Sequence, residues 1–134
     1  MDLEKLKEFF KNDHFAELAG IKIDEVSPGY CKASMKIEEK HLNSAKVVQG
    51  GAIFTLADYA FALAVNSRGQ LALAINANIS FMKGKSSGTL YAIAREVADP
   101  KRIGVYEVDV VDEEGEVISK FNGVAYRKSE KLPL

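Results

Sequence analysis

Asp58 is the residue that most suggests chemistry, because it is the only charged side chain between Val47 and Ser67. A carboxylate is unfavourable to bury among apolar side chains unless it gains a partner or a role. One interpretation is that Asp58 only fixes how a helix packs. Packing within one chain rarely needs such a group, so we favour a catalytic carboxylate.

A pair of glycines, Gly50 and Gly51, opens the same apolar stretch. Without side chains they allow a ligand to approach the backbone closely. The first amides of a helix lack intrahelical acceptors and favour nearby negative charge, as an oxyanion site requires. A plain hinge between loop and helix would explain the pair equally simply.

The spacing of Gly50 and Asp58 constrains any shared site. Eight residues of helix correspond to about 12 Å, so a carbonyl bound at the Gly50 amide cannot also contact Asp58 of its own chain. If both groups act on one substrate, Asp58 must come from a second copy packed antiparallel. The catalytic interpretation therefore requires at least a dimer with sites at its interface.

Other candidate sites are weaker. His14 and His41 do not have metal-ligand spacing with the single cysteine, Cys31, so we expect no metal. Cys31 alternates with polar residues on the apolar face of an expected strand, which indicates a core thiol, and His41 is best interpreted as a loop histidine. There is no Gly-x-Ser-x-Gly elbow for a serine nucleophile.

The segment Gly84-Lys85-Ser86 is similar to the end of a P-loop, but the required earlier glycine is replaced by Ile79. The segment also joins two expected strands instead of opening a helix. Lys83 and Lys85 could still contact a phosphate from this turn. A solvated turn without a ligand is an equal alternative.

The composition indicates one domain over residues 1–134. A net charge of −1 offers no general attraction for nucleic acid or an anionic membrane. Residues 1–13 are charged, unlike a secretory signal, and with the single cysteine they favour a cytoplasmic protein. The apolar stretch could span a bilayer by its length, but Asp58 at its centre favours a buried helix.

The apolar periodicity predicts an α+β protein. Short turns between successive strands indicate an antiparallel sheet, which must curl around a helix that is apolar on all sides. We expect residues 71, 73, 75, 77, 79 and 81 to form one apolar face, and residues 128–134 to form a loose tail. The expected elements are helices over 3–10, 13–20 and 51–67, and strands over 21–26, 31–37, 71–81, 89–97, 103–112 and 116–127.

Taken together, these residues resemble the hotdog-fold thioesterases of the PaaI-like phenylacetic-acid-pathway family. The resemblance lies in residues 43–67, in Asn-Ile-Ser-Phe-Met-Lys at 78–83 and in Gly-Val-Tyr-Glu-Val at 104–108. It implies the hotdog fold, an antiparallel β-sheet wrapped around one long central α-helix. It also implies a dimer with two interface sites, usually paired into a homotetramer.

The resemblance further implies roles for individual residues. Asp58 would be nucleophile or general base, the Gly50 amide would polarise a thioester carbonyl, and Asn43 would position water or substrate. The family usually has histidine where this chain has Gln49, which cannot carry a proton near neutral pH but can hydrogen bond. If that histidine only orients groups, Gln49 can replace it.

The expected function is hydrolysis of a medium-sized or aryl acyl-CoA, similar to phenylacetyl-CoA, to free acid and CoA. Besides the catalytic residues, we expect Gly51, Lys83 and Lys85 to bind substrate. The side chains of Tyr59, Phe61 and Phe81 suggest an apolar chamber for the acyl group. No cofactor is expected, because coenzyme A is part of the substrate. The alternatives are a non-catalytic acyl-CoA-binding protein and, more weakly, dehydration of a hydroxyacyl thioester.

Overall fold

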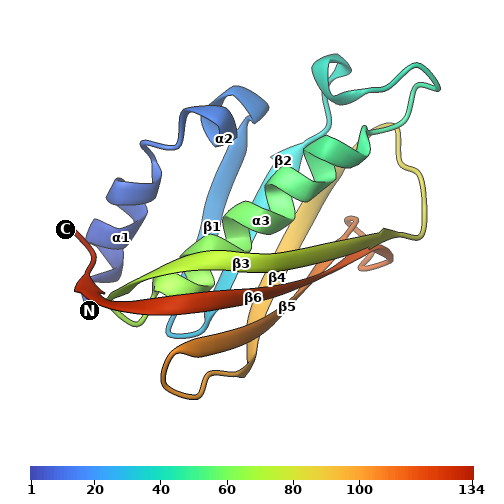
Figure 1. Ribbon diagram of the computed structural model, residues 1–134. Helices are drawn as coiled ribbons and strands as arrows, with labels where there is room; N and C mark the ends of the chain where they lie inside the picture. Colours follow the sequence, from blue (N-terminus) through green and yellow to red (C-terminus); the bar gives the residue numbers. More distant parts are fainter.

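A computed structural model describes residues 1–134 and shows one curled sheet around one long helix (Figure 1). The predicted elements are all present, with ends that differ from the prediction by at most four residues. Their bounds are α1 Leu3–Phe10, α2 His14–Ala19, β1 Ile21–Ser27, β2 Tyr30–Lys36, the 3-10 turn η1 Glu39–His41, α3 Gly50–Asn66, β3 Gln70–Phe81, β4 Thr89–Ala98, β5 Ile103–Val111 and β6 Val117–Lys131.

The six strands form a single antiparallel sheet in the order β1-β2-β4-β5-β6-β3. Helix α3 packs against every strand, so the sheet curls around it as the apolar sequence of this helix predicts. Strands β1 and β3 are the two edges of the sheet. This is the α+β hotdog architecture expected from the sequence.

The core lies between α3 and the concave face of the sheet. Phe61 of α3 contacts the rings of Tyr106 and Phe121, with centroids 5.8 and 5.6 Å away. Gly123 leaves space for this cluster, because a Cβ at that position would lie 2.7 Å from the Phe61 ring. The rings therefore fix α3 against the middle of the sheet.

The two short N-terminal helices have the predicted ends. Asp13 caps α2 by accepting the amide hydrogen of Ala16 at 3.0 Å, and Gly20 ends it with φ of 77°. This left-handed conformation is one that glycine adopts without strain. None of the helices is long and apolar enough to cross a bilayer.

Strand β3 differs from the prediction of one apolar face over residues 71–81. Its register with β6 shifts between Ala74 and Asn76, which leaves Ile75 as an extra residue. Such a bulge exchanges the two faces of a strand. Ala72 is therefore buried before it and Ile79 packs on the core after it, whereas Leu73 and Ile75 are exposed.

The expectation of a loose tail from residue 128 is also wrong for most of that segment. Strand β6 continues to Lys131, which pairs with Gln70. The Leu132 amide then donates to the oxygen of Gly69, and the Leu132 side chain is buried. The strand continues because β3 offers it a partner along this length, which a polar composition alone does not reveal.

Candidate functional site

The N-terminus of α3 carries two amides without a partner. Gln49 is the capping residue: its own amide donates to the oxygen of His41 at 2.8 Å, and its oxygen accepts from Ala52 at 3.0 Å. The amides of Gly50 and Gly51 donate to no acceptor in the chain. They are free to bind an oxygen that carries negative charge.

The two glycines make room for large neighbours on either side. A Cβ on Gly50 would lie 3.0 Å from the ring of Phe81, and a Cβ on Gly51 would lie 2.6 Å from the side-chain oxygen of Gln49. Neither glycine has a positive φ, so close approach, not backbone conformation, explains why side chains are absent here.

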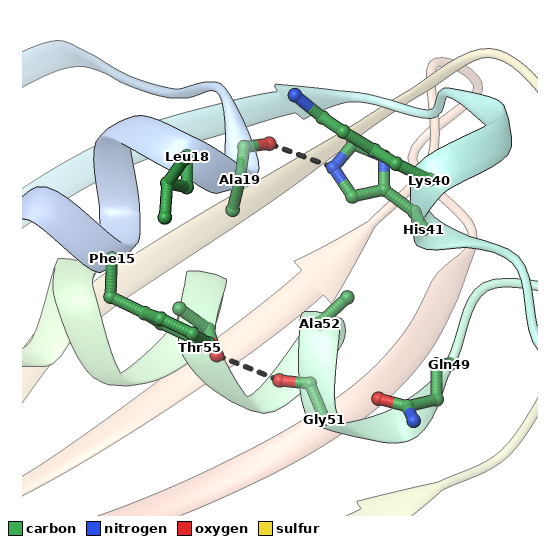
Figure 2. Close-up of a pocket in the computed structure, with 9 residues that line it drawn as sticks. All are labelled: Phe15, Leu18, Ala19, Lys40, His41, Gln49, Gly51, Ala52 and Thr55. Atoms are coloured by element: carbon green, nitrogen blue, oxygen red, sulfur yellow. Dashed lines mark hydrogen bonds between the residues drawn. The ribbon is translucent and has the colours of Figure 1, made fainter.

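Two grooves open beside this N-terminus. The α2 groove, of about 480 Å³, lies between α2, η1 and the first turns of α3; its walls include Phe15, Leu18, His41, Gln49, Gly51 and Thr55 (Figure 2). The β3 groove, of about 320 Å³, lies on the other side; its walls include Asn43, Gly50, Phe81, Met82 and Lys83. The candidate residues are therefore divided between two spaces that meet at the free amides.

Asn43 lines the β3 groove and Gln49 lines the α2 groove, and each has a side-chain group without a hydrogen-bond partner. The Asn43 oxygen accepts the amides of Ala45 at 2.9 Å and Val47 at 3.3 Å, which fixes the loop before α3. Its NH₂ group makes no hydrogen bond within the chain, and neither does the side chain of Gln49. Both residues thus have groups available to position a ligand or water.

Asp58 lies two turns further along α3, outside both grooves. Its carboxyl group is half-buried and has no hydrogen bond or ion pair, and its pKa is raised, mainly by burial and secondarily by the charge of Asp13. Because α3 is continuous from Gly50 to Asn66, the structure does not bring Asp58 to Gly50 of the same chain. This agrees with the spacing argument from the sequence.

Lys83 and Lys85 already have acidic partners. The Lys83 ammonium lies 2.6 Å from both carboxylate oxygens of Glu116, and that of Lys85 lies 3.3 Å from Asp112. Of the two, only Lys83 reaches a groove beside the free amides.

Three residues that sequence analysis weighed are structural. Cys31 is fully buried, and burial raises the pKa of its thiol to about 12. Tyr59 and Phe61, which suggested an apolar chamber, are buried in the core, and the Tyr59 hydroxyl donates to the oxygen of Phe10 at 2.8 Å. Of that set only Phe81 lines one of the two grooves beside the free amides.

The sequence reasoning did not single out Phe15 and Leu18. Both are large apolar side chains on α2 that are strongly exposed, and they lie three residues apart. The available signal was this spacing, which puts both on one face of a short helix whose neighbour Ala16 is buried.

Comparison with known proteins identifies the family. Residues 45–119, more than half of the chain, match the family model described as Thioesterase superfamily. The acyl-coenzyme A thioesterase PaaI of Escherichia coli is 34% identical over 119 residues, which cover 88% of this chain and 85% of that protein. A relative from Archaeoglobus fulgidus is 41% identical over 133 residues, covering 98% and 86%. The chain belongs to the Thioesterase superfamily.

The solved structures agree with this assignment. The E. coli PaaI protein from the phenylacetic acid degradation operon superposes with a TM-score of 0.89 at 31% identity, over 92% of this chain and 91% of that one. The TT0310 protein of Thermus thermophilus gives a TM-score of 0.83 at 33% identity, over 87% and 99%. The protein is thus a hotdog-fold thioester hydrolase.

Proposed function

We propose that this protein hydrolyses acyl-CoA thioesters with a medium-sized or aryl acyl group, similar to phenylacetyl-CoA, to the free acid and CoA. The observation that carries the proposal is the free Gly50 amide at the start of α3, in a groove that also contains Asn43. The name of the E. coli relative supports a CoA ester as substrate.

The site is completed by a second copy of the chain. Strand β3 is a long sheet edge that exposes Leu73, Ile75 and Phe81, and its outer side has no partner. An exposed apolar edge of this kind favours pairing with another strand. Antiparallel pairing of two β3 strands would set the two α3 helices antiparallel and direct the partner's Asp58 toward Gly50. Two such dimers would form a tetramer.

In the reaction, the thioester oxygen accepts a hydrogen bond from the Gly50 amide, with Gly51 as a second donor. The partner's Asp58 either attacks the carbonyl carbon, giving a mixed anhydride that water then hydrolyses, or removes a proton from an attacking water. The developing oxyanion is stabilised by the free amides and the dipole of α3. Collapse of this oxyanion breaks the carbon–sulfur bond and releases the CoA thiolate, which takes up a proton, in the water route the one that Asp58 removed. In the nucleophilic route this cleavage forms the mixed anhydride, and its hydrolysis by water follows.

The remaining site residues position the reactants. Asn43 and Gln49 hydrogen bond to water or to the thioester, and Lys83 and Lys85 contact CoA phosphates by exchanging their acidic partners. No step needs a metal or redox cofactor. The second candidate function is acyl-CoA binding without turnover, which the replacement of the family histidine by Gln49 favours.

Thioester cleavage across a panel of acyl-CoAs tests the activity, with Asp58→Ala and Asp58→Asn measured alongside. We expect a loss of about a hundredfold or more in kcat/KM in both variants, as for removal of a catalytic group. Saturable binding without cleavage in the wild type would select the binding function. Full activity in both variants would refute the role of Asp58.

Mixed dimers test the two-chain site. Gly50→Leu and Asp58→Asn are each expected to be inactive alone. Random mixing by refolding or co-expression makes about half of the dimers hybrid, and each hybrid has one intact site of two, so about a quarter of wild-type activity should return. A site within one chain would give no recovery.

A further inference from the structure

The α2 groove has an apolar wall built by two residues that no catalytic role explains. The side chains of Phe15 and Leu18 are 67% and 72% exposed, and Figure 2 shows the Phe15 ring lying toward Thr55 across the groove. Large apolar groups left this open at a cavity indicate a binding surface, because burying them against a ligand is favourable.

Lys40, Thr55 and His41 also line this groove; the exposed Lys40 ammonium lies 3.7 Å from a carboxylate oxygen of Glu38, and the polar groups of the other two are already satisfied. The Thr55 hydroxyl donates to the oxygen of Gly51 at 2.8 Å, which leaves its methyl group to face the groove. One ring nitrogen of His41 accepts the amide of Glu38 at 2.9 Å, and the other donates to the oxygen of Ala19 at 2.7 Å. Thr55 and His41 therefore contribute only carbon surface to a ligand.

At the end of the groove formed by the start of α3, by contrast, polar groups lack hydrogen-bond partners. There the Gly51 amide and the side-chain amide of Gln49 have no partners. The groove thus combines an apolar wall with hydrogen-bond donors at one end, which matches an acyl group whose carbonyl lies at the free amides. Its volume of about 480 Å³ lies within the usual range for small-ligand sites.

We propose that the α2 groove binds the acyl group of the thioester, and that Phe15 and Leu18 determine which acyl groups are accepted. The CoA arm then leaves through the β3 groove, past Lys83. This assignment rests on the proposed thioesterase function. It makes α2, an element outside the catalytic residues, the determinant of substrate specificity.

Binding of non-hydrolysable S-alkyl-CoA thioethers tests this assignment independently of turnover. Calorimetry would compare free CoA with ethyl, hexyl, octyl and phenylethyl thioethers on the wild type, Phe15→Ala, Leu18→Ala and Ala52→Leu. Val97→Ala is the matched control, because Val97 is an exposed apolar residue outside both grooves. Hydrolysis of the corresponding acyl-CoAs would be measured in parallel.

In the wild type, affinity should rise by up to about fourfold for each methylene group that is buried. Phe15→Ala and Leu18→Ala should each lose about tenfold for the hexyl, octyl and phenylethyl ligands and leave free CoA and the ethyl ligand unchanged. Ala52→Leu, which fills the groove, should weaken the longest ligand most. Val97→Ala should match the wild type.

Two results would overturn the assignment. An equal loss of affinity for free CoA and all thioethers would place the CoA arm in the α2 groove, and unchanged selectivity in all variants would leave the groove without a role in specificity. Either can occur while the wild type cleaves acyl-CoAs. Failure of the proposed function is a separate result, seen as absence of cleavage with the acyl-dependent binding pattern intact.

Discussion

The imidazole of His41 is hydrogen bonded to the main-chain oxygen of Ala19, with its Nε2 2.7 Å from that oxygen. Its Nδ1 accepts the amide hydrogen of Glu38, so Nε2 is the nitrogen that donates to Ala19. The main-chain oxygen of His41 in turn accepts the Gln49 amide. A single residue therefore fixes the end of α2 relative to the start of α3.

We expect His41→Ala to lower the free energy of unfolding by about 2 kcal/mol, because it removes two buried hydrogen bonds and leaves a void. It should also raise KM for long acyl groups more than it lowers kcat, since the walls of the α2 groove lose their connection. His14→Ala is the control, because His14 is exposed on the first turn of α2. Urea unfolding and steady-state kinetics measure both effects; equal midpoints for the two variants would contradict the structural role.

Asp58 should make the protein less stable as pH rises. Burial raises its pKa in the folded state above the ordinary value of 3.8, so the folded protein retains the proton to higher pH than the unfolded chain does. The free energy of unfolding therefore falls as pH rises from about 4 through the folded-state pKa. Asp58→Asn should match the wild type at lower pH and be more stable above this window. Thermal melting of both proteins over a pH series measures the difference in stability. A difference in melting temperature that stays constant with pH would show that Asp58 does not titrate in this way.

The replacement at Gln49 predicts a simple pH profile. Because glutamine has no proton to exchange, kcat/KM of the wild type should show the ionisation of Asp58 and no second limb near neutral pH. Gln49→His should add a limb at about pH 6.5, the ordinary pKa of histidine. The plateau value of kcat/KM should stay within about threefold of the wild type. Gln49→Ala controls for the loss of hydrogen bonding. A limb near pH 6.5 already present in the wild type would point to another titrating group.

A buried ion pair connects strand β6 to the segment that follows β4. The guanidinium of Arg127 binds both carboxylate oxygens of Asp99, and the two side chains are 8% and 5% exposed. Arg127→Met should destabilise the protein by about 3 kcal/mol, because it leaves the buried Asp99 carboxylate with only the Tyr106 hydroxyl at 3.3 Å and the longer Arg68 contact at 3.8 Å. Arg95→Met removes one of the two exposed partners of Asp109, leaving Lys120, and should change stability by less than about 1 kcal/mol. Similar unfolding midpoints for both variants would contradict the difference.

The sequence predicts the architecture well because its strongest patterns are long. The stretch around Asp58 is apolar on all sides and defines α3, and the alternation around Cys31 defines β2. The bulge at Ile75 was not predictable, because a one-residue shift of register depends on how β6 pairs with β3. Burial of Leu132 likewise depends on the neighbouring Gly69, which is distant in sequence.

The candidate site was only partly predictable for the same reason. Spacing along one helix places Gly50 and Asp58 relative to each other, and the structure agrees with it. The division of Asn43 and Gln49 between two grooves depends on how α2 and the loop after β3 fold against the start of α3. Only that packing shows that Phe15 and Leu18 line a groove, because exposed apolar residues on a short helix are otherwise common.

Burial of Cys31 has a practical consequence for measuring this enzyme. Its thiol is the only one in the chain, is fully buried and has a pKa of about 12, so it is neither accessible nor ionised at neutral pH. Chromogenic disulfide reagents that react with thiolates should therefore give no signal from the folded protein. The colour that develops during a reaction reports released coenzyme alone, and a slow additional rise would report unfolding.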